Sequence, residues 1–290
     1  MNHPLLPYIC CPTCKRALKN SSRALMCGHC HRTYPIRNGI PILIDLSTLT
    51  PHLAGQVKYF EKEDAARSKY VLEPWQRRYV DNFLASYIRT KGLIVDNATG
   101  SGYMAIELAK RGYRVIAMDL TYAELMKLKV NIARLKLQKN ILLVCASSEE
   151  LPVKTNSADG MVANAILEHL PHEKKAINEI GRVLKKDAVL MLAMPIHLLY
   201  VWPFLWPINI RHDRRIGHLR RYTRESIRKG FSKFREMNTY YTGSLGKIAC
   251  IVLKILTKNP RWDEWGESID AYTAKMPYGS SNVVSILQKK

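Results

Sequence analysis

The sequence predicts an α/β fold with a mostly parallel sheet, preceded by a small metal-stabilised domain. Two observations lead to this expectation. Five of the seven cysteines lie within the first 30 residues. Further along, an apolar stretch, a glycine-containing loop, a helical pattern and a second apolar stretch follow one another, as in a strand–helix–strand unit. A length of 290 residues suits one large domain with a small appendage.

The composition is that of an ordinary globular protein. Apolar residues make up 47% and charged residues 24% of the chain, which excludes a largely disordered protein. The longest apolar run, Leu198–Ile208, contains two prolines, so we expect no transmembrane segment, and no signal peptide is expected. The net charge of +21 suggests a polyanionic partner, either nucleic acid or an anionic lipid surface. The alternative is a host whose proteins are generally basic.

The clustered cysteines predict a zinc site. Cys11 and Cys14 form one Cys-x-x-Cys pair, and Cys27 and Cys30 form another after 12 intervening residues. Four thiolates close a tetrahedral shell, so the site is expected to be structural, in a segment too small to fold unaided. Three neighbours are alternative ligands: Cys10, His29 and His31. Such a cluster favours a reducing compartment, so we expect a cytoplasmic protein, peripheral to the membrane in one interpretation.

A hairpin is expected directly after the cysteines. Asn38-Gly39 is a turn signal between two apolar runs within residues 34–44. The cysteine pairs followed by Tyr-Pro-Ile-x-x-Gly-Ile-Pro resemble the small zinc-ribbon proteins that dock onto and activate methyltransferases. This resemblance covers about residues 7–46 and implies a zinc-ribbon domain over residues 1–46.

Residues 47–91 are expected to form a helical bridge. Pro74 can occupy the first turn of a helix, and apolar side chains recur at helical spacing from Trp75 to Ile88. We interpret this segment as a helix packed on the main domain or, alternatively, as a lid over a bound cofactor. The aromatic lid candidates are Tyr59, Phe60, Tyr70 and Trp75.

The main domain is expected over residues 92–290. Leu93–Asp96 and Arg114–Asp119 predict strands on either side of a glycine loop and a helix, Tyr103–Lys110. The glycines let the backbone approach a ligand at the helix N-terminus, where the amides favour an anionic group. Asp119 at the end of the second strand can accept hydrogen bonds from ribose hydroxyls. This arrangement suits either a dinucleotide or S-adenosylmethionine (SAM).

The motifs that follow decide between the two cofactors. Ser147-Ser-Glu-Glu-Leu-Pro, then Asn164-Ala-Ile-Leu-Glu-His-Leu-Pro, precede the apolar strand Ala188–Met194. From about Leu93 to Pro195 the chain resembles class I SAM-dependent methyltransferases, in the type 11 branch that includes the quinone-biosynthesis methyltransferases. The resemblance implies a Rossmann-like methyltransferase sheet whose last strand is antiparallel. It also implies SAM as cofactor and S-adenosylhomocysteine as product.

The resemblance also assigns roles to residues around the cofactor. Asp96 and the loop after it would hold the methionine part, Asp119 the ribose, and the Ser147 segment the adenine. The full set of expected cofactor-binding residues is Asp96, Asn97, Ala98, Gly100, Gly102, Asp119, Leu120, Ser147, Ser148, Glu149 and Asn164. The family usually has glycine at the position of Ala98 and aspartate at that of Ser147, so we expect weaker adenine recognition. Glu168 and His169 are interpreted as structural.

Two insertions are expected to shape the acceptor site because loops at strand ends form the pocket in such sheets. They cover residues 196–222 and residues 243–281. The first joins an aromatic run, with Trp202 and Trp206, to a basic run that suits an anionic membrane surface. A folded lid with a solvated basic edge is the alternative. Within the second, Leu245–Leu256 predicts a helix that is apolar nearly all round, interpreted as core or, alternatively, as membrane-facing.

These features together predict methyl transfer from SAM to a small-molecule or lipid-like acceptor. RNA methylation is the alternative, favoured by the charge and by the ribbon, and SAM binding without catalysis is a further alternative. The candidate catalytic residues are His218, as a general base toward a hydroxyl acceptor, and Tyr222.

Overall fold

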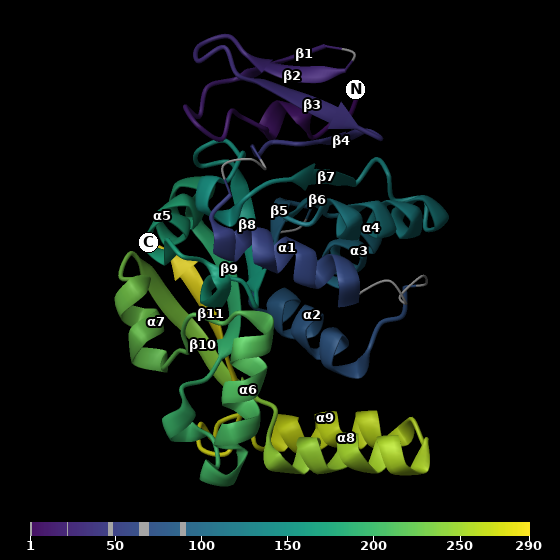
Figure 1. The fold of residues 1–290 in the computed structure, drawn as a ribbon, viewed down its shortest axis with the longest axis vertical. Helices are drawn as coiled ribbons and strands as arrows, with labels where there is room; N and C mark the ends of the chain where they lie inside the picture. Colours follow the sequence, from purple (N-terminus) through teal and green to yellow (C-terminus); the bar gives the residue numbers. More distant parts are fainter. Residues whose placement is uncertain (1, 22, 46–48, 64–69, 88–90) are drawn as a thin grey trace.

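The computed structural model describes residues 2–21, 23–45, 49–63, 70–87 and 91–290. Its N-terminal part is a small antiparallel sheet, at the top of Figure 1, separate from the main sheet. A 3-10 helix at Leu6–Tyr8 is followed by β1 (Leu18–Asn20), β2 (Ala24–Cys27), β3 (Thr33–Arg37) and β4 (Ile40–Pro41). Asn38 and Gly39 join β3 to β4 with φ angles of 48° and 73°, as the predicted hairpin turn requires.

The main sheet has seven strands in the order β10-β11-β9-β8-β5-β6-β7. Their bounds are β5 (Leu93–Asn97), β6 (Arg114–Asp119), β7 (Ile141–Cys145), β8 (Ala158–Asn164), β9 (Leu184–Pro195), β10 (Phe234–Thr242) and β11 (Asn282–Lys289). Strands β5 to β9 pair in parallel, whereas β11 runs antiparallel to both β9 and β10. The predicted mostly parallel sheet with an antiparallel last strand is therefore confirmed.

Helices cover both faces of this sheet. Four of them are α3 (Tyr103–Lys110), α4 (Tyr122–Arg134), α5 (Glu173–Val183) and α7 (Arg224–Gly230). Because successive side chains of a strand point to opposite faces, β6 contributes to two cores. Val115 packs with residues of α2 to α4, whereas Ile116 packs with α5 and with the ribbon residues Leu5 and Leu25. The ribbon therefore shares a hydrophobic core with the α5 face of the sheet.

The predicted bridge contains two helices, α1 (Pro51–Glu63) and α2 (Pro74–Ser86), drawn in blue between the ribbon and the lower helices in Figure 1. Pro74 starts α2, as its fixed φ favours, and Glu73 forms a capping box with Gln76. The expected boundary after residue 46 and the expected helical residue Ile88 lie outside the described residues.

The first insertion is a folded unit. It contains short 3-10 helices at Leu198–Tyr200 and Pro203–Leu205 and the helix α6 (Trp206–Ile216). The indole nitrogen of Trp206 donates hydrogen bonds to the carbonyls of Leu198 and Val201 at 2.9 and 3.0 Å. Trp206 therefore stabilises the insertion itself, and its expected contact with a lipid layer stays a prediction.

The second insertion is a helical hairpin of α8 (Leu245–Thr257) and α9 (Arg261–Tyr272), at the lower end of Figure 1. Its base is anchored because the buried Asp270 accepts hydrogen bonds from the amides of Gly243 and Ser244. The interpretation of α8 as a core helix is wrong, since Cys250 is its only buried residue. None of the described helices is long and apolar enough to cross a bilayer.

Candidate active site and metal centre

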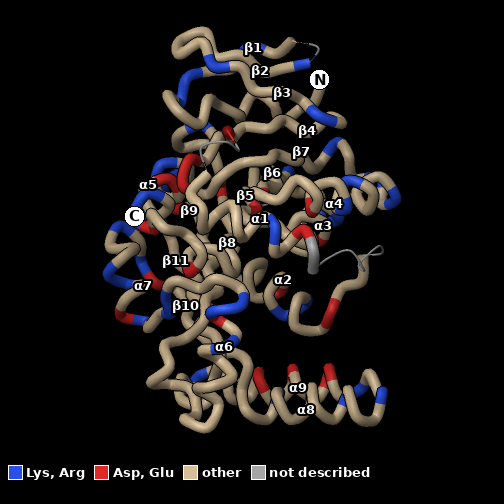
Figure 2. The backbone as a smooth tube through the Cα atoms, in the orientation of Figure 1, with Lys and Arg blue, Asp and Glu red and all other residues tan. Residues whose placement is uncertain are grey.

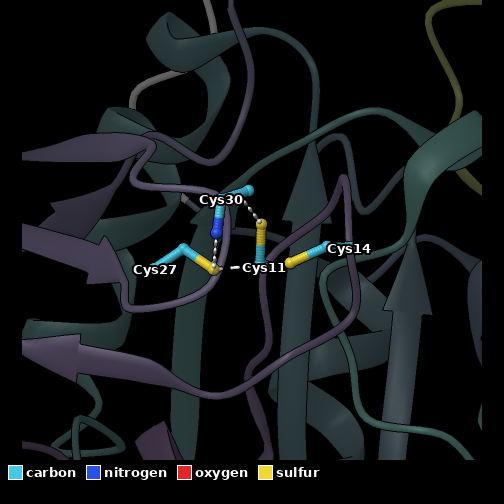
Figure 3. Close-up of side chains that lie close together, drawn as sticks. All are labelled: Cys11, Cys14, Cys27 and Cys30. Atoms are coloured by element: carbon cyan, nitrogen blue, oxygen red, sulfur yellow. Dashed lines mark hydrogen bonds between the residues drawn. The ribbon is translucent and has the colours of Figure 1, made fainter.

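The four predicted zinc ligands converge. Figure 3 shows Cys11, Cys14, Cys27 and Cys30 with their sulfur atoms turned toward one another. Their Sγ atoms all lie within 4.8 Å of one another, with 3.6 Å between Cys11 and Cys30 and 3.4 Å between Cys14 and Cys27. A tetrahedral zinc ion with Zn–S bonds of about 2.3 Å separates its sulfur ligands by roughly 3.8 Å. The cluster therefore fits a structural zinc ion without rearrangement, and Tyr34 adds a hydroxyl 3.3 Å from Cys11 Sγ.

The three alternative ligands stay outside this group. Cys10, His29 and His31 are absent from the metal-binding clusters that the described residues form. Cys10 is fully buried, and this burial raises the pKa of its thiol to about 11. Its backbone amide donates to the carbonyl of Pro152 at 2.9 Å, so Cys10 helps to attach the ribbon to the main domain.

A second attachment reaches the edge strand of the main sheet. The amide of Leu43 donates to the carbonyl of Cys145 at 2.8 Å, and Ile42 forms a parallel bridge with the same residue. Cys145 ends β7 two residues before Ser147, where the predicted adenine segment begins. The ribbon thus supports the chain at the point where it enters the predicted cofactor site.

A cavity of about 790 Å³ lies at the carboxyl ends of β5, β6 and β8, which is where ligands bind in open parallel sheets. Seven of the eleven expected cofactor-binding residues line it: Ala98, Gly100, Asp119, Leu120, Ser147, Ser148 and Asn164. The other four, Asp96, Asn97, Gly102 and Glu149, stand behind this lining.

The four residues behind the lining hold the loops in place. Asp96 accepts hydrogen bonds from the Thr99 hydroxyl at 2.6 Å and from the Ala105 amide at 3.1 Å, and burial raises its pKa to about 6. Asn97 accepts from Ser148 at 2.8 Å, and Glu149 accepts from the amide of His172 at 2.8 Å. Asp96 therefore supports the loop, and its expected contact with the cofactor stays a prediction.

The glycine loop needs its glycines. Gly102 has a φ of +76°, and a Cβ atom placed there would lie 2.2 Å from Leu128 Cδ1. Ala98 adopts a φ of +61°, a conformation that costs an alanine more than the glycine usual in the family. Asp119 closes the loop, because its carboxylate accepts hydrogen bonds from the amides of Gly100 at 2.9 Å and Thr121 at 2.8 Å.

Asn164 provides a test of whether a cofactor fits this cavity. Its side-chain nitrogen donates to the hydroxyl of Tyr103 at 2.8 Å. Its Oδ1 atom is buried and has no hydrogen-bond partner among the described residues. A buried acceptor without a partner is costly, and a ligand that brings a donor would satisfy it. The ammonium group of SAM is such a donor, so the residues present fit this cofactor.

The cavity lining also includes acidic and histidine side chains. His218 lines the cavity, and its Nδ1 atom lies 2.8 Å from Asp213 Oδ1. Glu168 and His169, interpreted from the sequence as structural, also line it. Burial raises the pKa of Glu168 to about 8 and lowers the pKa of His169 to about 3. The backbone amide of Leu219 donates a hydrogen bond to the carbonyl of Glu168 at 2.7 Å. This contact joins two segments that are distant in the sequence, so no local pattern could predict the cluster.

Tyr222 is placed differently from the expectation. It is buried beside β9, outside the lining of the cavity, and its hydroxyl donates to Glu173 at 2.7 Å. A catalytic role for Tyr222 is therefore withdrawn. Of the lid candidates, Phe60 and Trp75 line the cavity, whereas the Tyr70 hydroxyl donates to Glu107 at 3.0 Å in the neighbouring groove.

Two sequence families match separate parts of the chain. The family described as "Methyltransferase domain" matches residues 95–192, and the family described as "Trm112p-like protein" matches residues 2–39. Among curated proteins, the ubiquinone/menaquinone biosynthesis C-methyltransferase UbiE of Rickettsia prowazekii (strain Madrid E) is 34% identical over 115 residues, covering 38% of this chain and 46% of that protein. The corresponding protein of Rickettsia massiliae (strain Mtu5) is 33% identical over the same length. The chain thus spans less than half the length of these relatives.

Solved structures share the fold at low sequence identity. Geranyl diphosphate C-methyltransferase from Streptomyces coelicolor A3(2), in complex with S-adenosyl-L-homocysteine, has a TM-score of 0.61 at 12% identity, covering 83% of this chain and 99% of that one. The [4+2]-cyclase SpnF has a TM-score of 0.56 at 16% identity, covering 87% and 99%. Since one of these neighbours is a cyclase, the fold alone does not assign the reaction.

Proposed function

We propose that this chain, a methyltransferase domain preceded by a Trm112p-like zinc ribbon, transfers a methyl group from SAM to a small, apolar, lipid-like acceptor. The observation that carries the proposal is the composition of the single cavity at the carboxyl ends of β5, β6 and β8. Its lining combines polar groups that suit SAM with apolar side chains from α1 and α8.

Different polar residues of the cavity would bind different parts of the cofactor. Asp119 would accept hydrogen bonds from the ribose hydroxyls, and Ser147 would stand where the adenine lies. Asn164 Oδ1, the buried acceptor without a partner, would take a hydrogen bond from the ammonium group. SAM supplies an electrophilic methyl group on a sulfonium, and the protein's part is to hold the acceptor in line with it and to exclude water.

The apolar side comes from the bridge and from the second insertion. Leu53, Val57 and Phe60 of α1 line it, and Ile248 and Ile251 of α8 complete it. Such a surface favours an acceptor with a substantial apolar part. The relatives are named for quinone biosynthesis and one structural neighbour for geranyl diphosphate, and both names support an acceptor of this class.

The exposed face of α8 supports delivery of the acceptor from an anionic lipid surface. Ile255 and Leu256 are 70% and 73% exposed, and Phe204 of the first insertion is 62% exposed. Arg214 and Arg215 near the end of α6 are also exposed. Exposed apolar side chains on a strongly basic protein are a combination that suits interfacial binding. In Figure 2 the remaining basic residues are spread over the ribbon, α4, α5 and α7 and form no single stripe.

An Ile255→Ser/Leu256→Ser variant is expected to bind vesicles of phosphatidylglycerol and phosphatidylcholine roughly tenfold more weakly or worse, because two apolar side chains no longer leave water. Co-sedimentation measures this, and SAM affinity should not change. Val130→Ser is the matched control, since Val130 is an exposed aliphatic residue of α4, away from the hairpin. Equal binding by the wild type and the double variant would contradict the membrane-facing role of α8.

Transfer of label from methyl-labelled SAM to a cell extract tests the proposal. The product is expected to partition into organic solvent and to resist RNase. Label released by RNase would instead support the RNA alternative that the charge suggests, and label in no fraction would support SAM binding without catalysis.

A further inference from the structure

Three ligand-bearing side chains meet at the acceptor side of the cavity. Glu168 and His169 belong to a 3-10 helix, Leu167–His169, after β8, and His218 follows α6. One ligand atom from each lies within 4.8 Å of the other two. His218 Nε2 lies 3.8 Å from Glu168 Oε1, and the rings of His169 and His218 are 4.7 Å apart.

Two of these side chains, Glu168 and His169, are buried and carry polar atoms without a hydrogen-bond partner among the described residues. Glu168 is fully buried, and among the described residues neither of its carboxylate oxygens accepts a hydrogen bond. His169 Nδ1 is likewise buried without a partner in the described chain. Buried polar atoms are nearly always satisfied in folded proteins, and a carboxylate beside two imidazoles is a common set of metal ligands.

Asp213 orients one of the imidazoles. Its Oδ1 atom lies 2.8 Å from His218 Nδ1, and Arg221 holds the same carboxylate at 2.7 Å. With its proton on Nδ1, the His218 ring presents an unprotonated Nε2 to Glu168. A carboxylate behind a metal-binding histidine typically fixes the tautomer and the ring orientation in this way.

We propose that Glu168, His169 and His218 bind a divalent transition-metal ion at the acceptor side of the cavity, with Asp213 as a positioning residue. Three protein ligands leave coordination positions open, and all three side chains line the cavity. If the proposed function holds, the open coordination positions select apolar acceptors that carry a metal-binding oxygen. Only this consequence rests on the proposed function. His218 is then a ligand and not the general base that the sequence suggested.

Metal binding by the full chain tests this directly. Mn²⁺ is the probe, because carboxylate ligands suit it whereas thiolates select zinc, so the ribbon does not compete for it. Calorimetric titration should show one Mn²⁺ per chain in addition to the zinc found by elemental analysis. Glu168→Gln and His218→Ala should each lower the Mn²⁺ affinity more than tenfold, and Asp213→Asn should lower it roughly 10- to 100-fold.

His212→Ala is the matched control. The ring of His212 lies 6.0 Å from that of His218 and also lines the cavity, but His212 is not one of the three clustered ligands. It should leave Mn²⁺ affinity unchanged, and thermal unfolding should show that all variants remain folded. The electron paramagnetic resonance spectrum of bound Mn²⁺ should change in Glu168→Gln, where a neutral amide oxygen or water replaces an anionic ligand.

Two results would overturn the metal site: no Mn²⁺, Co²⁺ or Zn²⁺ binding beyond the zinc of the ribbon, or equal Mn²⁺ affinity in the wild type and Glu168→Gln. Neither result depends on methyl transfer. A bound ion without any transfer of label would support the metal site and contradict the proposed function. Transfer of label without a bound ion would support the proposed function and contradict the metal site.

Discussion

A Cys11→Ser/Cys14→Ser variant is expected to lose its zinc completely, from one ion per chain to none, and to unfold the ribbon. The sulfur atoms of the four cysteines converge within 4.8 Å, and structural zinc supplies about 10–16 kcal/mol of apparent binding free energy. That exceeds what so small a segment gains from its own hydrophobic core. Elemental analysis gives the zinc content, and limited proteolysis shows whether residues 2–45 remain protected.

Cys10→Ser is the control for this variant. Cys10 is adjacent in sequence and fully buried, but lies outside the sulfur cluster, so Cys10→Ser should keep its zinc. Any main domain that stays soluble without the ribbon should still bind SAM, because the ribbon supplies no residue to the cavity lining. A metal-free native protein, or zinc retained by the double variant, would show that the cluster is not a zinc site.

Asp119→Ala is expected to weaken SAM binding by roughly tenfold or more. Hydrogen bonds to a charged group contribute about 1.5–3 kcal/mol each, and Asp119 is the acid at the end of β6 that borders the cavity. The substitution also frees the amides of Gly100 and Thr121, which Asp119 now holds at 2.9 and 2.8 Å. Calorimetric titration with SAM measures the loss.

Asp119→Asn separates the two contributions, because the amide keeps the shape of the side chain and one acceptor oxygen but loses the charge. Asp187→Asn is its matched control, since Asp187 is an exposed residue of β9 outside the cavity lining. Thermal unfolding checks that the loop remains folded. SAM affinity equal to wild type in Asp119→Ala, or binding of NAD in place of SAM, would contradict the assignment of this site.

Local patterns in the sequence were sufficient to predict the zinc ribbon and the main sheet. Four cysteines in two pairs can close one tetrahedral site, and a strand, a glycine loop and an acid at the next strand end have few alternative folds. The strand expected at Arg114–Asp119 has those bounds in the structure. The family matches confirm the predicted methyltransferase domain and the predicted zinc ribbon.

The acceptor side depended on contacts between distant segments and was predicted less well. A helix that is apolar nearly all round, such as α8, is expected from its sequence to lie in the core, yet Cys250 is its only buried residue. The indole of Trp206 meets two carbonyls of its own insertion, which no residue pattern indicates. The cluster of Glu168, His169 and His218 forms only because the chain after α6 returns to the end of β8.

The most direct test of the central claim is the stoichiometry of transfer in one reaction. Purified protein, methyl-labelled SAM and a membrane lipid extract are incubated, and S-adenosylhomocysteine is quantified beside the label that enters the organic phase. The account predicts one S-adenosylhomocysteine for each methyl group recovered in organic-soluble product, with both falling together in Asp119→Ala. S-adenosylhomocysteine that accompanies label in RNA, or no S-adenosylhomocysteine at all, would contradict it.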